Sequence, residues 1–105
     1  MTAELEIVDT LAPMHPGELL RDEFMIPLGL SAGKVAKAIG VPRTRIERIV
    51  AGEIGISADT ALRLARLFDV NPRYWANAQS HYDLEIAALK LGSRIDQIQP
   101  IERAA

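Results

Sequence analysis

The chain lacks cysteine, and its 105 residues include only two histidines, one tryptophan, two tyrosines and two phenylalanines. Without cysteine there is no disulfide framework, thiolate nucleophile or cysteine zinc site, and an intracellular location is favoured. His15 and His81 stand outside any HExxH pattern, and no glycine-rich phosphate loop occurs. We therefore expect no enzyme, no cofactor and no metal site. For His15 and Glu18, three residues apart, we expect a structural or capping role.

The sequence also lacks any apolar run long enough to span a membrane. Its first residues, MTAELEIVD, are acidic and have no basic segment followed by an apolar stretch, so a secretory signal is not expected. A composition of 49% hydrophobic and 25% charged residues is ordinary for a soluble globular protein of one domain. These features predict a cytoplasmic protein with no membrane partner.

Positive charge is scarce outside one region. The whole chain carries −2, residues 1–30 hold one arginine against six acids, and residues 31–66 hold seven basic residues against three acids. The net charge is therefore about −5 in the first region and about +4 in the second, and local potential decides where a polyanion binds. The basic region is the candidate nucleic-acid surface.

The basic region contains Ser31 to Gly52, SAGKVAKAIGVPRTRIERIVAG, which predicts two short helices joined by a turn at Gly40-Val41. Gly40 suits the left-handed position past a helix end, and Pro42 suits a first helical turn. Small Ala36 allows close approach, and large Ile46 fills the angle between the helices. This pattern is typical of a helix-turn-helix.

A helical wheel separates the second of these helices into two faces. Ile46, Ile49 and Val50 form the inner face, and Thr44, Arg48 and Ala51 point away from it. Recognition helices read the major groove with their N-terminal residues and outer face. A plain solvated helix, with Arg43 paired to Glu47, is the alternative. The residues that we expect to contact DNA are Ser31, Ala32, Lys34, Pro42, Arg43, Thr44, Arg45 and Arg48.

Three more helices are expected around this pair. The first starts near Pro16 and ends before Pro27, because proline disfavours helix in the preceding residue; its core residues are Leu19, Leu20, Phe24 and Met25. The next follows an N-cap at Ser57 and runs to Phe68, with Ala61, Leu62, Ala65 and Phe68 inward. The last begins at Pro72 after an Asn71 N-cap and ends at Leu91.

The last helix carries two apolar stripes, and one domain needs only one of them. The first stripe contains Trp75, Ala78, Tyr82, Ile86 and Leu89 and closes the domain. The second contains Tyr74, His81, Leu84, Ala88 and Leu91, and we expect it to form a homodimer interface. The alternative is that both stripes are buried in one five-helix monomer. The expected organisation is an arm over 1–13, either flexible or an added strand, a domain over 14–92, and a tail over 93–105, either a frayed end or an edge segment.

Four segments together resemble a known family. Ser31 to Phe68 resembles an Xre/Cro-type helix-turn-helix, and HPGELL at 15–20, ISADTALRLARLFDVNPRYW at 56–75 and NAQSHYDL at 77–84 resemble HigA (VapI-like) antitoxins. The resemblance covers about three quarters of the chain. It implies an all-α, five-helix, lambda-repressor-like domain with the helix-turn-helix at helices 2 and 3. Pro42 departs from the Ser or Thr common in relatives and removes a hydroxyl that could contact phosphate.

The resemblance also implies a function and two partners. A HigA-type antitoxin binds double-stranded operator DNA, represses its own operon and neutralises a HigB-type ribonuclease toxin. Because such a toxin must hold RNA phosphates, we expect it to be basic and to meet an acidic surface. The candidate toxin-binding residues are Glu4, Glu6, Asp9, Glu18, Asp22 and Glu23. The alternatives are that these acids only maintain solubility, and that the protein is a stand-alone Xre-type repressor.

Overall fold

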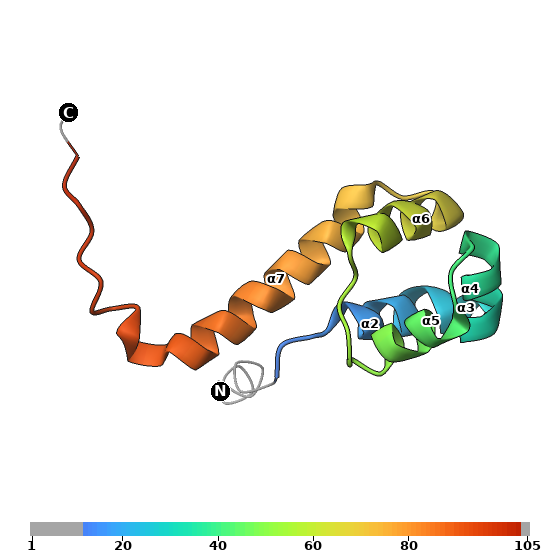
Figure 1. Cartoon of the computed structure of the whole chain (residues 1–105), viewed down its shortest axis with the longest axis horizontal. Helices are drawn as coiled ribbons and strands as arrows, with labels where there is room; N and C mark the ends of the chain where they lie inside the picture. The colour runs from blue at the N-terminus through green and yellow to red at the C-terminus, as the bar shows by residue number, and fades with distance from the viewer. Residues whose placement is uncertain (1–11, 104–105) are drawn as a thin grey trace, which may run out of the picture.

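The computed structural model describes residues 12–103, and within this range it contains helices and no strand. Figure 1 shows the shorter helices gathered in one body and a long last helix that leaves it. The elements are α2 (Pro16–Leu19), η1 (Leu20–Met25), α3 (Ile26–Leu28), α4 (Ala32–Ile39), α5 (Arg43–Val50), α6 (Ala58–Phe68), α7 (Pro72–Leu91) and η2 (Gly92–Arg94). Since α2, η1 and α3 are continuous, the predicted all-α fold of five helices is confirmed.

The prediction that the first helix ends before Pro27 is wrong. The helix continues through Pro27 to Leu28. Its middle part, η1, is a π-helix, and the Ile26 N–H donates to the carbonyl of Arg21, five residues back. A proline ring normally clashes with the carbonyl four residues before it, and wider π turns relax that geometry. Gly29, with φ 64°, ends the helix. The wide turn therefore allows the proline inside the last turn.

The helix-turn-helix consists of α4 and α5. Ser31 caps α4, because its Oγ accepts a hydrogen bond from the Lys34 N–H at 3.1 Å, as predicted. Gly40 adopts φ 74° and ψ 39°, the left-handed conformation that makes glycine the favoured residue there. Pro42 is the N-cap of α5 and has extended backbone, so the helix begins at Arg43, one residue later than predicted.

The core lies between these helices, and its largest fully buried side chains include Trp75, Leu20, Ile46, Ile49 and Leu64. In α6 the inward face differs from the predicted one. Leu62 is exposed, whereas Leu64 is fully buried beside Ala61 and Ala65. The packing of α6 against α4 and α7 sets this rotation, which periodicity alone leaves open.

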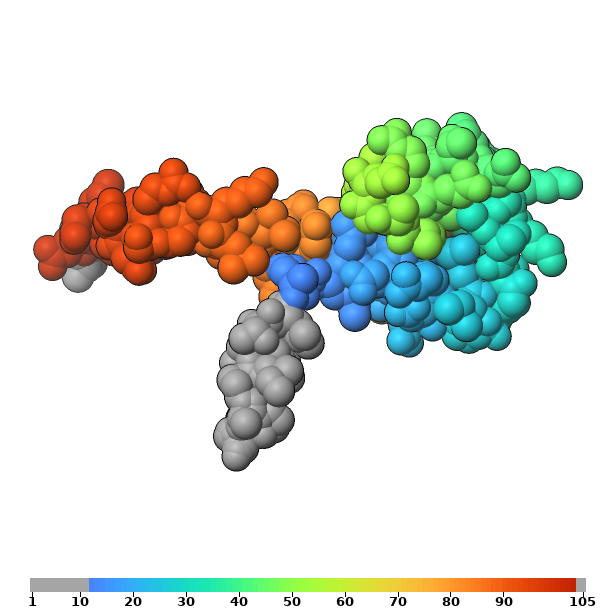
Figure 2. Space-filling view, turned by 90° about the horizontal axis from the view of Figure 1, so that it is seen from below, coloured from blue at the N-terminus to red at the C-terminus, as the bar shows by residue number. Residues whose placement is uncertain are grey.

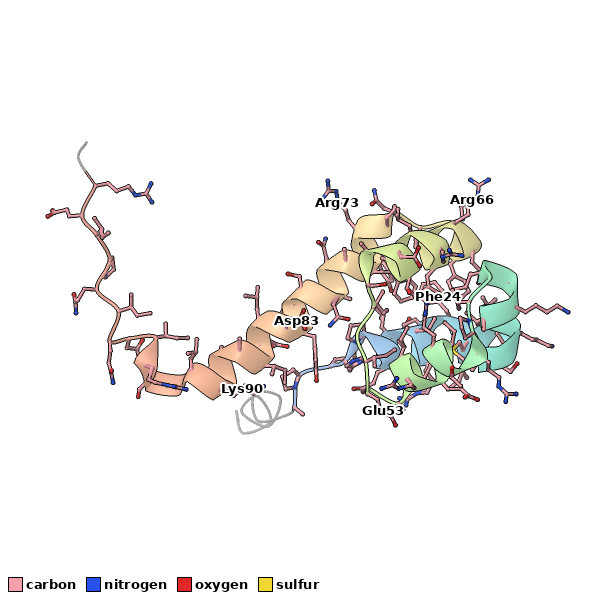
Figure 3. The ribbon with its side chains drawn as sticks, in the orientation of Figure 1. Phe24, Glu53, Arg66, Arg73, Asp83 and Lys90 are labelled. Carbon is pink, nitrogen blue, oxygen red and sulfur yellow. The ribbon has the colours of Figure 1, made fainter. Side chains whose placement is uncertain are left out.

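The start of α7 completes the core. Its Asn71 side chain caps the helix through the Arg73 N–H at 2.9 Å. Trp75 follows, and its ring centroid lies 5.1 Å from that of Phe24, which in turn lies 4.6 Å from that of Phe68. Figure 3 shows Phe24 between the first helix and α6. This aromatic cluster joins the first, fourth and fifth helices of the domain.

The C-terminal part of α7 extends away from the body, as the space-filling view shows (Figure 2). The Cα radius of gyration is 17.4 Å, against about 13 Å for a compact chain of this length. Leu89 belongs to the stripe predicted to face the core, yet it is exposed, because the domain does not reach this far along the helix. We call residues 83–103 the distal arm; the remaining part of α7, with the helices before it, is the domain.

Candidate nucleic-acid interface

The outer face of α5 is the centre of the candidate interface. Ile46 and Ile49 are fully buried, and Val50 is half-buried. Arg43, Thr44, Arg48 and Ala51 are exposed. The predicted division of this helix into an inner and an outer face is therefore confirmed. The arrangement leaves the N-terminal end and one side of α5 available for a groove.

The starts of α4 and α5 lie next to each other. A Cβ built on Gly33 would lie 3.4 Å from Cδ of Arg43, so the Arg43 side chain passes over the first turn of α4. Ser31 and Lys34 are exposed, and Ala32 is half-buried at the same end. Backbone N–H groups at a helix start attract phosphate. The start of α4, with Ser31 and Lys34, thus adjoins Arg43 at the start of α5.

Each arginine of α5 has an acidic neighbour. Arg43 lies 3.4 Å from Glu47, Arg48 lies 3.4 Å from Glu53, and Arg45 lies 3.4 Å from Asp59 of α6. Figure 3 places Glu53 at the end of α5. The Arg43 and Arg48 pairs are solvent-exposed and therefore weak, so phosphate or a base edge can compete for these two guanidiniums. The Arg43–Glu47 contact, which belongs to the alternative interpretation of a solvated helix, exists and leaves Arg43 accessible.

The HPGELL segment holds the opposite end of α5. His15 caps α2 by accepting from the Gly17 N–H at Nδ1, 2.9 Å away, and Glu18 accepts from the His15 N–H. A Cβ at Gly17 would lie 1.8 Å from the Ile49 carbonyl oxygen, so only glycine allows this approach. The His15 ring also packs edge-on against Tyr82, with centroids 4.8 Å apart. The predicted capping role of His15 and Glu18 is confirmed.

The NAQSHYDL segment holds the loop that follows α5. The Gln79 Oε1 accepts a hydrogen bond from the Ile56 N–H at 2.6 Å, and its Nε2 donates to Asp83 at 3.0 Å. A Cβ at Gly55 would lie 2.9 Å from the Gln79 amide, so glycine is needed for this contact. Sequence reasoning singled out neither Gln79 nor Gly17; the signal was their place inside two motifs of the resemblance.

The five residues predicted for the dimer interface do not share one environment. Tyr74 packs on the domain, its ring centroid 5.8 Å from that of Phe24, and burial raises its pKa, with Glu23 as a second cause. His81 is exposed and lies 3.4 Å from Glu85. Leu84, Ala88 and Leu91 are exposed on the distal part of α7. The last three therefore form the accessible part of the set.

The acidic candidates also differ among themselves. Glu4, Glu6 and Asp9 lie outside the described residues. Glu18 is half-buried in its capping contact. Asp22 accepts hydrogen bonds from Arg21 at 2.7 and 3.1 Å, and these hold its pKa below the ordinary value. Glu23 is exposed. Arg21 thus offsets part of the negative charge expected on this face.

Two kinds of site have no candidate among residues 12–103. No three histidine or acidic side chains are grouped to hold a metal ion there. Even α7, the longest helix of this range, is too polar to cross a lipid bilayer, and the shorter ones are not candidates either.

An all-helical domain whose second and third helices form a tight, glycine-turned pair, with an arginine-bearing outer face, defines a helix-turn-helix protein. Consistent with this geometry, the helix-turn-helix family model matches residues 22–75. The chain belongs to the HigA (VapI-like) antitoxins of the helix-turn-helix family. The predicted family is confirmed.

Relatives with names support this assignment. Virulence-associated protein I of Dichelobacter nodosus is 51% identical over 74 residues, which are 70% of this chain and 68% of the relative. Antitoxin HigA-1 of Vibrio cholerae is 33% identical over 69% of this chain and 68% of its own. The solved structure of Pseudomonas aeruginosa antitoxin HigA with the higBA promoter is 42% identical, with a TM-score of 0.82 over 86% of this chain and 99% of that one.

Proposed function

We propose that the protein is a DNA-binding antitoxin of a HigBA-like module: it binds operator DNA, represses its own operon in the bacterial cytoplasm and neutralises a ribonuclease toxin. The observation that carries the DNA-binding part is the exposed arginine face of α5 above the buried Ile46 and Ile49. The relative solved with promoter DNA has the same fold over nearly its whole length.

In this proposal Arg43, Thr44 and Arg48 read base edges in the major groove. The residues that position the domain on the phosphates are Arg45, Lys34 and Ser31, with Ala32 at the start of α4 and Pro42 at the start of α5. A bidentate arginine–guanine contact contributes about 1 to 3 kcal/mol of base discrimination, whereas a phosphate contact acts on all sequences alike. The two roles therefore predict different effects of substitution.

The test compares three alanine variants. Arg48→Ala is expected to relax preference at one base step, by roughly 5- to 150-fold on the scale of 1 to 3 kcal/mol. Lys34→Ala should weaken binding to every duplex and reduce the salt slope by about one. Arg73→Ala is the control, because Arg73 is exposed on α7, away from α5 (Figure 3). Unchanged affinity and preference in Arg48→Ala, measured by fluorescence anisotropy over a salt series, would reject the assigned face.

We further infer that two copies pair through α7. Leu84 and Leu91 are large aliphatic side chains 68% and 42% exposed on one helix, and seven residues separate them, as in helix-pairing stripes. Tyr74, His81 and Ala88 complete the predicted set. A two-fold pair would place two copies of α5 about one DNA turn, roughly 34 Å, apart. The operator should then be palindromic.

Toxin neutralisation needs a second surface, distinct from the one that reads DNA. We propose the acidic N-terminal face: Glu18, Asp22 and Glu23, together with Glu4, Glu6 and Asp9. Among the described residues of this face, Glu18 is used in a cap and Asp22 is paired with Arg21, whereas Glu23 is exposed and has neither contact. Glu23 therefore gives the clearest test. Glu23→Lys should slow association with the cognate toxin in a salt-dependent way and leave operator binding unchanged, because rim charges act on encounter rates.

Glu102→Lys is a matched control, since it makes the same charge change at an exposed position of the distal arm. Equal association rates for both variants and wild type in stopped-flow measurements would move the toxin surface elsewhere. If no toxin is encoded beside the gene, the protein is a stand-alone Xre-type repressor. The DNA-reading face would be the same in that case.

A further inference from the structure

Arg63 of α6 reaches the turn between the two helices of the helix-turn-helix. Its Nη1 donates a hydrogen bond of 2.7 Å to the carbonyl of Ile39, the last residue of α4. Carbonyls at a helix end lack partners inside the helix and carry the negative end of its dipole. A Cβ at Gly40 would lie 3.5 Å from the same Nη1. The guanidinium therefore caps α4 and covers the turn.

Asp59 connects this cap to the recognition helix. Its Oδ2 accepts from Nε of Arg63 at 3.0 Å and from Nη1 of Arg45 at 3.4 Å. Arg45 belongs to α5, Asp59 and Arg63 belong to α6, and Ile39 belongs to α4. One carboxylate and two guanidiniums thus link all three helices in a single chain of hydrogen bonds. We call Arg45, Asp59 and Arg63 the brace.

The brace differs from the Arg48–Glu53 ion pair at the end of α5. Glu53 lies 3.4 Å from Arg48, the same separation as between Asp59 and Arg45. The Glu53 side chain is 61% exposed and that of Asp59 58% exposed, so solvent screens both similarly. However, Glu53 joins α5 only to the loop that follows it. The two acids are therefore matched in charge and exposure and differ in whether they connect helices.

Orientation matters because α5 is short. Its eight residues span about 12 Å, so a tilt of about 10° at its end moves its N-terminal side chains by roughly 2 Å. Hydrogen bonds to base edges tolerate only a few tenths of an ångström. Binding sites need such side chains held by supporting contacts as well as by the core.

We propose that Asp59 and Arg63 are positioning residues for operator recognition: they fix the angle between α5 and α4 and so determine sequence preference without contacting bases. The inference depends on the proposed DNA binding. Arg45 has two roles in this proposal. It is a component of the brace, and it contacts phosphate from the position in which Asp59 holds it. The Asp59 carboxylate also repels phosphate. If Asp59 acted only through its charge, removing that charge would strengthen DNA binding to every sequence.

The test uses a duplex enriched by the wild-type protein from a random library, and a shuffled duplex of the same composition. The ratio of the two affinities measures preference. Asp59→Asn should lower this ratio at least fivefold and leave affinity for the shuffled duplex equal or higher. Glu53→Gln removes the same charge and should keep the ratio within twofold. Arg63→Lys, which keeps the charge but not the two-sided hydrogen bonding, should behave like Asp59→Asn.

Urea unfolding of each variant comes first. Arg63→Lys carries the test if Asp59→Asn is unfolded, and Arg63→Gln takes the place of Arg63→Lys if that variant is unfolded. A ratio within twofold of wild type in Asp59→Asn, or an equal loss in Glu53→Gln, would overturn the proposal. If the wild-type protein itself shows no preference, the proposed function fails instead. The brace is then judged by amide residual dipolar couplings: an unchanged α4–α5 angle in Asp59→Asn would overturn it independently of DNA.

Discussion

The domain and the distal arm both contain large aliphatic side chains, and the two regions use them differently. In the domain Leu20, Ile46 and Leu64 are fully buried. In the distal arm Leu84, Leu89 and Ile98 are 68%, 70% and 70% exposed. Burial of such a side chain contributes about 1.5 to 3 kcal/mol to the free energy of folding. The side chains of the distal arm do not make this contribution in a single chain. The difference separates residues that fold this chain from residues available to a partner.

The largest expected difference in stability is between two leucine-to-alanine substitutions, one in the domain and one in the distal arm. Leu64→Ala removes a fully buried side chain and should lower the free energy of unfolding by about 2 to 5 kcal/mol. Leu89→Ala, on the exposed helix, should change it by less than about 0.5 kcal/mol. Urea unfolding followed by Trp75 fluorescence measures both. Equal losses would show that the arm is packed in solution.

A smaller effect is expected from closing the space at Gly17. Gly17→Ala would force a Cβ against the Ile49 carbonyl and should cost about 1 to 3 kcal/mol. Gly33→Ala is the control, because its nearest neighbour is the flexible Arg43 side chain, 3.4 Å away. Alanine is also the better helix former, by about 0.5 to 1 kcal/mol. Thermal melts of Gly17→Ala at or above the wild-type midpoint would refute the close approach.

The smallest effect concerns the boundary between the two regions. Gln79→Ala leaves the Ile56 N–H without its acceptor and should cost about 1 to 2 kcal/mol. Asn77→Ala, at an exposed position two residues earlier, should be near neutral. Hydrogen exchange at the Ile56 amide gives the specific readout. Protection that persists in Gln79→Ala would mean that the loop is held by other contacts.

Local chemistry made the helix ends predictable. Ser31, Gly40, Ser57 and Asn71 each act within a few residues, through a cap or a left-handed backbone, and the structure places each as expected. The prediction that the first helix ends before Pro27 was wrong for a related reason. The usual effect of proline assumes an α-helix before it, and the preceding turn is a π-helix.

Contacts between distant elements were not predictable in the same way. Leu62 and Leu64 fit the helical period of α6 almost equally, and only the packing of α6 decides between them. Gln79 reaches a backbone 23 positions away, and Arg63 reaches one 24 positions away. A single sequence gives no signal for either partner. The exposed face of α5 could be predicted because it follows from one helix alone.

The most direct test of this comparison is sedimentation equilibrium of the full chain, alone and with its enriched duplex, at micromolar concentration. We expect a dimer that binds one palindromic duplex with two chains. We also expect that Leu84→Asp with Leu91→Asp gives a folded monomer, since both side chains are exposed in the single chain. A wild-type monomer that binds one chain per duplex, or a double variant that remains dimeric, would contradict this expectation.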